Sequence, residues 1–401
     1  MDVAAEWLCV VYATEQRDLQ LMISVTWGPI PGSRSSRVEL LVGGRRGSAR
    51  VIPVSRPALL RSSRSSSRNY FCSEEASFRP PADLPTTMAP RTDFPPVRAC
   101  LFDMDGLLLD TEDIYTLCIN LLLEKYDRPN LPWSIKAQLQ GRPFPQANAI
   151  FHEWAQLPVP QDDYNKQIQD LQSQHFPTTK PLPGVEKLLS DLGRTRWWDL
   201  SASDGKTPGD RTARPHRVHI ALATSSHSKN FQIKTAHLTE LFSVFETPRR
   251  VLGDDQRVAP GRGKPLPDIY LLALQTINDS LPAGEKPITP EECLVFEDSV
   301  PGVEAGRRAG MRVVWCPHPM LKQEYAGREA EILAGRMGAA GEAVDVHQLG
   351  EIGDGWADYY QDLQNFPYEK YGMAIPPAET ELEPAMQEDL SQRIVAESAE
   401  Q

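Results

Sequence analysis

The sequence predicts an α/β protein built on a parallel sheet, and two features between residues 97 and 316 carry this prediction. Short apolar runs recur along the chain, and each ends in acidic or hydroxyl-bearing residues before a helical segment begins. Repeated units of strand, polar turn and helix favour parallel strands joined by crossover helices. After the first apolar run, a long stretch has helical patterning only, which predicts a helical subdomain inserted into the sheet.

The predicted elements follow this alternation in order. Short apolar runs bounded by turn or polar residues are typical of buried strands. The predicted strands are 99–102, 218–223, 292–296 and 312–316. The predicted helices are 114–126, 133–139, 145–155 and 162–175 in the insert, and 185–192, 229–238, 268–277 and 303–309 around the sheet.

The first predicted strand leads directly into two acids, Asp103 and Asp105, and Gly106 then breaks the run. Carboxylates just beyond a strand project from the carboxyl edge of the sheet, where open α/β sheets bind their ligands. Two carboxylates this close repel each other unless a cation or proton lies between them. A hard divalent ion, Mg²⁺ first of all, suits that position, although the same residues also suit a simple polar turn.

Later predicted strands end in further polar groups. Thr224 and Ser225 follow the second strand, Lys264 lies in the next loop, and Glu297 and Asp298 end the third strand. Taken alone, each of these residues could equally be a helix cap or a charge in a loop. In this order and at successive strand ends, they supply a metal site, a nucleophile, a hydroxyl donor and a cation, which together transfer a phosphoryl group.

These stretches resemble the haloacid-dehalogenase superfamily of phosphohydrolases from Val97 to about Cys316. The four family motifs are at residues 103–112, 220–226, 263–268 and 294–305. The resemblance implies a Rossmann-like parallel-sheet core with an inserted helical cap. Within the superfamily the chain is most similar to the pseudouridine-5'-phosphatase group and its fungal members, through residues 223–226, 251–255, 264–269, 293–298 and 366–369.

The resemblance also implies a catalytic centre and a metal site. Asp103 is similar to the nucleophile that forms an aspartyl-phosphate, and Asp105 to the general acid and base. Mg²⁺ is expected on the Asp103 side chain, the Asp105 main-chain carbonyl and Asp298. Glu297 is expected to be a further ligand or a group that orients the others.

Phosphate binding is implied for the second and third motifs. Thr224 and the Ser225 amide are expected to bind phosphate oxygens. Lys264 is expected to neutralise the phosphate and to keep the nucleophile ionised. Two other lysines, Lys229 and Lys234, are interpreted as ordinary charges on a helix surface.

The candidate substrate-specificity residues of the cap are Gly141 and Arg142, with Gln140 and Lys136 nearby. Arg142 is interpreted either as a clamp for a second anionic or polyol group of the substrate or as a solvated charge at a helix end.

Three functions are compatible with these motifs. Within the resemblance, an acid two places after the nucleophile favours a phosphatase or a phosphomutase over a dehalogenase or an ATPase. We expect first a Mg²⁺-dependent phosphatase acting on a small nucleoside or sugar phosphate. The alternative is a sugar phosphomutase of the β-phosphoglucomutase type on the same scaffold. A non-catalytic binding protein is the third, but no chemical residue of the motifs is missing.

Composition limits the partners. A net charge of −12 argues against a general nucleic-acid binder. No apolar run approaches the ~18 residues of a membrane helix, and the six cysteines have no paired spacing. We expect a cytoplasmic protein, monomeric or weakly dimeric, with a phosphate ester as its ligand and neither nucleic acid nor membrane as a partner.

The predicted domains are a core at 97–111 and 183–350 with a cap at 112–182. Residues 193–217, charged and without periodicity, are predicted to be a surface insertion within the core. An acidic tail, 373–401, is predicted to be disordered.

Residues 1–96 are rich in Arg, Ser and Pro, and we predict that this extension is disordered. One hypothesis makes it a targeting arm, read from an internal start such as Met22, which would favour a mitochondrial location. The other places the native start at Met88.

Overall fold

The structure is a computed structural model that describes residues 39–42, 45–48, 89–197, 216–339 and 349–377. The chain divides into two units, Met1–Pro80 and Pro81–Gln401. In the first unit, strand β1 (Glu39–Val42) pairs with β2 (Arg45–Ser48) as an antiparallel hairpin. The hairpin lies within the N-terminal extension, most of which the sequence predicts to be disordered. Most of the predicted targeting arm, of the insertion and of the acidic tail lies outside the described residues.

The second unit is built on a six-stranded sheet in which all neighbouring strands are parallel. This sheet confirms the predicted α/β class. The order is β5-β4-β3-β6-β7-β8, so the chain moves outward from β3 in one direction and then in the other. The strands are β3 (Ala99–Phe102), β4 (His219–Ala223), β5 (Arg250–Val251), β6 (Cys293–Glu297), β7 (Arg312–Trp315) and β8 (Ala357–Tyr359).

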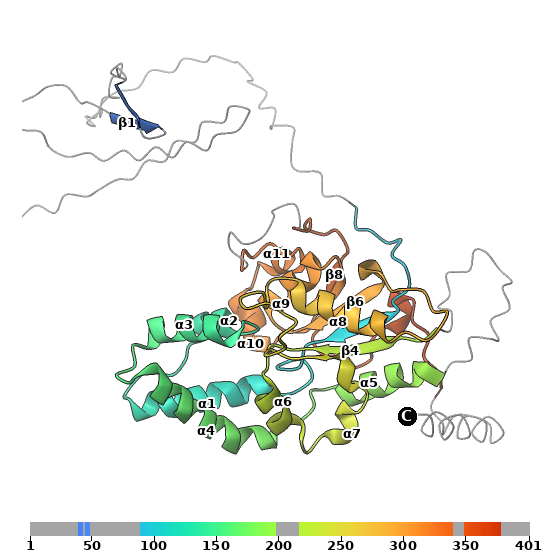
Figure 1. Cartoon of the computed structure of the whole chain (residues 1–401), viewed down its shortest axis with the longest axis horizontal. Coiled ribbons are helices and arrows are strands. Elements are labelled where there is room, and N and C mark those ends of the chain that lie inside the picture. The colour runs from blue at the N-terminus through green and yellow to red at the C-terminus, as the bar shows by residue number, and fades with distance from the viewer. Residues whose placement is uncertain (1–38, 43–44, 49–88, 198–215, 340–348, 378–401) are drawn as a thin grey trace, which may run out of the picture. The chain divides into compact units, whose positions relative to one another are not determined.

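Helices cover both faces of the sheet (Figure 1). Successive strand residues alternate between the faces: Cys100 and Phe102 belong to one buried cluster, and Ala99 and Leu101 belong to the other. The first cluster includes residues of α5 (Val185–Arg194), α6 (Ser228–Thr235) and α7 (Thr239–Phe242). The second includes residues of α8 (Asp268–Asp279), α9 (Val300–Arg308) and α11 (Glu329–Leu333), and α10 (Pro319–Glu324) follows β7.

Four helices inserted between β3 and β4 form the cap. They are α1 (Thr111–Lys125), α2 (Trp133–Leu139), α3 (Phe144–Ala155) and α4 (Gln161–His175). In Figure 1, α1 lies beside α4 and α2 beside α3. The cap has a hydrophobic core of its own, which includes Cys118 and Leu122 of α1, Phe151 of α3 and Ile168 of α4. No helix in the described ranges combines the length and the apolar character needed to cross a bilayer.

The folded core continues past residue 350, where the predicted core ended. Strand β8 adds a sixth strand beyond that point, and Phe366 and Tyr371 pack in the same buried cluster as β3. Met373, predicted to begin the tail, is 0% exposed. The predicted boundaries are therefore wrong here. The apolar residues that return to the core are scattered among polar ones, so no strand or helix periodicity reveals them.

Because residues after 350 pack into the core, we expect the Phe366 side chain to stabilise the fold. Its ring lies 5.2 Å from the ring of Phe296 and 5.2 Å from that of Tyr371. Because Phe366 is 6% exposed, Phe366→Ala should lower the free energy of unfolding by about 3–5 kcal/mol. The control Ile352→Ala, at a side chain that is 45% exposed, should change it by less than about 0.5 kcal/mol. Urea unfolding would measure both, and equal effects would contradict this packing.

Two other predicted boundaries also shift. Residues before 97 are not all detached from the core, since the Phe94 ring packs edge-on against Trp356 at 4.9 Å. Arg91 forms an ion pair with Glu291 at 3.1 Å. Helix α5 runs into the predicted 193–217 insertion and is followed by a 3-10 turn, Thr195–Trp197.

Candidate active site

Three strands bring the motif residues to one edge of the sheet. Asp103 follows β3, Thr224 follows β4, and Glu297 is the last residue of β6. The strand order reverses between β3 and β6, and such a switch point is where open α/β sheets bind ligands.

A buried acid cluster lies at this edge. Asp103, Glu297 and Asp298 each offer a carboxylate oxygen, and these three atoms lie within 4.8 Å of one another. The Lys264 ammonium donates to Asp103 and lies 2.6 Å from Glu297 Oε1. When all three acids are ionised, they exceed the single ammonium by two negative charges in a buried place. Hard oxygen donors with this charge fit a divalent cation.

Both carboxylate oxygens of Glu297 are contacted by hydrogen-bond donors of other residues. Tyr270 OH and Lys264 contact Oε1, while the Ser299 amide and hydroxyl lie 3.2 and 3.0 Å from Oε2. Gly302 lies so close that an added Cβ would be 1.9 Å from Glu297 Cδ. Of the two roles expected for Glu297, these contacts favour orienting the cluster over direct coordination.

Burial and mutual repulsion shift the pKa values of the acids. Burial, and next the charges of Glu297 and Asp105, raise the pKa of Asp103 to about 7 against the opposing effect of Lys264. Burial and the charges of Asp103 and Glu297 raise the pKa of Asp298 well above its usual range. Burial disfavours the Lys264 ammonium, but its two acidic neighbours more than compensate and raise its pKa. A divalent cation would relieve this repulsion.

The Asp105 side chain lies apart from the acid cluster. Ser226 Oγ donates to its Oδ2 at 2.6 Å, and the Lys234 ammonium lies 2.5 Å from its Oδ1. Lys234 also contacts Tyr115 OH at 2.7 Å. The interpretation of Lys234 as a surface charge is therefore wrong, since its side chain is fully buried. One signal was present: Lys234 follows Phe231 by three residues, so both lie on one face of α6.

The second motif faces the same site. Thr224 is buried, and its Oγ1 accepts a hydrogen bond of 3.0 Å from the Ser226 amide, which leaves its own hydrogen to donate. Ser225 Oγ donates to the main-chain oxygen of Gly141 at 3.3 Å, so the core and the cap touch here.

A cavity of about 430 Å³ lies between the cap and the sheet edge. Six predicted site residues line it, namely Asp103, Asp105, Gly141, Arg142, Thr224 and Ser225. The other three, Lys264, Glu297 and Asp298, are buried outside its lining. The structure therefore distinguishes predicted site residues on the cavity wall from those buried behind it.

Residues 97–310, more than half of the chain, match the family of haloacid dehalogenase-like hydrolases. The chain belongs to this family. An uncharacterized protein of Schizosaccharomyces pombe is 39% identical over 59% of this chain and 86% of its own length. Proteins named as probable pseudouridine-5'-phosphatases are similar too: one of Saccharomyces cerevisiae is 40% identical over 60% of this chain and 90% of its own, and one of Drosophila melanogaster is 34% identical over 59% and 89%.

On the cap side of this hydrolase, Gln140 reaches the acid cluster. Its Nε2 donates to Asp298 Oδ2 at 2.5 Å, and within the described chain its buried Oε1 has no hydrogen-bond partner. Arg142 lines the cavity, but its guanidinium donates to the main-chain oxygens of Gln138 and Ala339 at 2.8 and 3.2 Å. The hydrogen bond to Gln138 agrees with the interpretation of Arg142 as a charge at a helix end. Its position on the cavity wall agrees with the interpretation as a clamp for the substrate.

Gly141 is expected to be needed for closure of the cap onto the core. Its φ is +74°, and an added Cβ would lie 2.1 Å from Ser299 Oγ. Gly141→Ala should therefore lower kcat/KM about tenfold or more by displacing the cap. Gly327→Ala is the matched control, because Gly327 has a φ of +83° but no atom within 4 Å of an added Cβ. Both variants carry backbone strain of about 1–3 kcal/mol, so equal activities in a phosphate-release assay would contradict the role of the contact.

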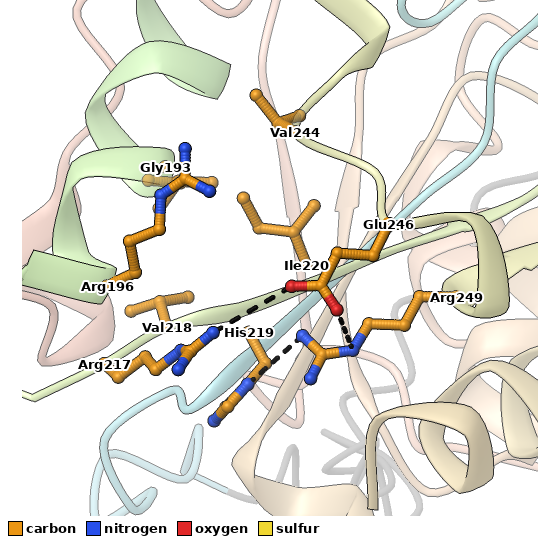
Figure 2. Close-up of a pocket in the computed structure, with 10 residues that line it drawn as sticks. Gly193, Arg196, Arg217, Val218, His219, Ile220, Val244, Glu246 and Arg249 are labelled. Carbon is orange, nitrogen blue, oxygen red and sulfur yellow. Dashed lines mark hydrogen bonds and ion pairs between the residues drawn. The ribbon is translucent and has the colours of Figure 1, made fainter. Parts of the chain in front are cut away.

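A second, smaller pocket of about 30 Å³ surrounds the amino end of β4 (Figure 2). Its carboxylate, Glu246, lies 3.9 Å from Arg217 and 3.5 Å from Arg249. Burial lowers the pKa of His219 to about 4, so its neutral ring accepts from Arg249 at Nδ1. Arg217 and Arg249 both pair with Glu246, and the lining of this pocket contains none of the motif residues.

Proposed function

We propose that this hydrolase is a Mg²⁺-dependent phosphatase that cleaves a small phosphate monoester through an aspartyl-phosphate on Asp103. One observation carries the proposal. Among the described residues, Asp103 alone both belongs to the buried acid cluster and lines the cavity. A phosphate group in the cavity can therefore meet the nucleophile beside the metal site.

Each site residue has its own role in the two steps of the proposed reaction. An Asp103 oxygen attacks phosphorus as the bond to the leaving oxygen breaks, and Asp105, as the general acid, gives that oxygen a proton, which releases the alcohol. Asp105 then takes a proton from water, whose oxygen attacks phosphorus and frees phosphate and the Asp103 carboxylate. Thr224 and Ser225 hold phosphate oxygens, and Lys264 keeps Asp103 in place by its direct contact.

The metal would be held by the side chains of Asp103 and Asp298 and by the main-chain oxygen of Asp105, with Glu297 orienting the cluster. When bound, Mg²⁺ would offset the negative charge of the phosphate and of the acids around it.

The cavity supports a nucleoside or sugar phosphate as the substrate. Its lining includes the amides of Asn148, Gln172 and Asn230 and the aromatic ring of Phe151. Amides suit sugar hydroxyls and base edges, and the ring suits a flat base. The relatives named as pseudouridine-5'-phosphatases favour the nucleoside phosphate.

A panel of phosphate esters assayed with Mg²⁺ tests the proposal. Phosphate release should be fastest with nucleoside 5'-monophosphates or phosphosugars. Failure to release phosphate from any ester would reject it. Interconversion of phosphosugar isomers without phosphate release would instead favour the second candidate, a sugar phosphomutase, which needs the same core residues.

We further propose a cytoplasmic location and a monomer or weak dimer. Size-exclusion chromatography with light scattering would test the assembly. Imaging of the full chain, tagged at its C-terminus, would distinguish the cytoplasm from the mitochondrial alternative.

A further inference from the structure

Both carboxylate oxygens of Asp105 are held by one connected set of side chains. The Lys234 ammonium lies 2.5 Å from Oδ1, and Ser226 Oγ donates to Oδ2 at 2.6 Å. Lys234 and Ser226 also contact each other at 2.8 Å. With a partner on each oxygen, the carboxylate cannot rotate without breaking a hydrogen bond.

Lys234 has an unusual position for a lysine on a helix. Such side chains ordinarily extend their ammonium group into water, whereas this one is 0% exposed. A buried ammonium is unfavourable unless it is paired and hydrogen-bonded. Its partners are Asp105, Tyr115 and Ser226, and Asp105 is the acid among them.

Lys234 also contacts both connections between the core and the cap. Its ammonium lies 4.6 Å from the ring centroid of Tyr115, in the first turns of α1, and 4.5 Å from that of Phe176, which follows α4. Its main-chain oxygen accepts a hydrogen bond of 2.9 Å from Thr179 Oγ1. The group that holds Asp105 is thereby fixed to the two segments on which the cap is mounted.

We propose that Lys234 is a positioning residue that holds the Asp105 carboxyl group where it meets the leaving oxygen, and that it couples this position to the cap. The inference rests on the proposed function, in which Asp105 protonates that oxygen. Lys234 itself need not touch the substrate, and it does not line the cavity. Its effect should therefore depend on how much protonation the leaving group needs.

Two esters separate this role from a merely structural one. p-Nitrophenyl phosphate releases a stable phenolate that needs little protonation, whereas an alkyl phosphate releases an alkoxide that needs a proton. The comparison uses kcat/KM, which covers the steps up to release of the alcohol. The alkyl ester is one that the wild type hydrolyses in the panel described above.

Lys234→Met should lower kcat/KM at least about tenfold more for the alkyl ester than for the aryl ester, since a general acid contributes roughly 10²–10⁴-fold. Ser226→Ala, a smaller change, should shift the ratio in the same direction by about threefold or more. The control Gln232→Met introduces the same side chain on the exposed face of α6 and should leave both values unchanged.

Equal losses for the two esters in Lys234→Met would overturn the inference and leave the phosphatase function standing. If circular dichroism shows that Lys234→Met does not fold, Ser226→Ala decides, and an unchanged ratio in that variant overturns it. A wild type that releases phosphate from no ester of the panel would reject the proposed function, and this inference with it.

Discussion

Replacement of Asp103 by asparagine should abolish phosphate release while the protein stays folded. The amide cannot form the aspartyl-phosphate, so turnover should fall by roughly 10⁴-fold or more. Asparagine has nearly the same volume, which matters because Asp103 is 6% exposed. The control is Asp113→Asn on α1, whose side chain is 79% exposed, and it should retain full activity. Activity of Asp103→Asn within tenfold of the wild type would identify another nucleophile.

The same variant should change how stability depends on pH in the metal-free protein. A carboxyl group with a raised pKa in the folded state stabilises the fold at low pH, and this contribution is lost as pH rises through the folded-state pKa. For Asp103, burial and acidic neighbours raise the pKa to about 7, so the loss extends from about pH 4 to about pH 7. The melting temperature of Asp103→Asn should therefore fall less than that of the wild type across this range.

The strand ends that form the candidate active site could be predicted because the sequence pattern of each strand is local. The apolar runs before Asp103, Thr224 and Glu297 are short and continuous, as buried parallel strands require. Parallel strands place their carboxyl ends at one edge, so three local patterns predict one site. The structure brings these three residues to that edge.

The supporting side chains could not be predicted in this way. Lys234 is 129 residues from Asp105 and Gln140 is 158 residues from Asp298, so their contacts depend on how the cap and α6 pack. A lysine in a helix is ordinarily exposed, and the spacing of Lys234 from Phe231 does not by itself outweigh that tendency. Strand β8 was missed for a related reason: it is three residues long and half-buried, with no apolar run.

Removal of divalent cations should stop turnover and destabilise the protein, and added Mg²⁺ should restore both. Within the described part of the chain, the Lys264 ammonium is the one cation paired with the buried cluster of Asp103, Glu297 and Asp298. A cation at one hundred times its Kd stabilises the folded state by about 2.7 kcal/mol. Mg²⁺ should thus raise the melting temperature by roughly 5–10 °C for a domain of this size.

Asp298→Asn should remove most of this response, because it deletes a side-chain ligand of the proposed site. Glu246→Gln is the matched control, since this carboxylate pairs with arginines in the smaller pocket (Figure 2) and should leave the response intact. Calorimetric titration with Mg²⁺ gives the affinity directly and does not depend on turnover. Full activity in excess chelator would contradict the metal site.

The affinity for Mg²⁺ should also rise with pH. Burial and the charges of Asp103 and Glu297 raise the pKa of Asp298 well above its usual range in the metal-free protein, so protons compete with the cation for this carboxylate. Calorimetry should therefore give a lower Kd at pH 8 than at pH 6, with protons released on binding. An affinity that is independent of pH would mean that these carboxylates are already ionised without the metal, and that Lys264 alone is enough to balance them.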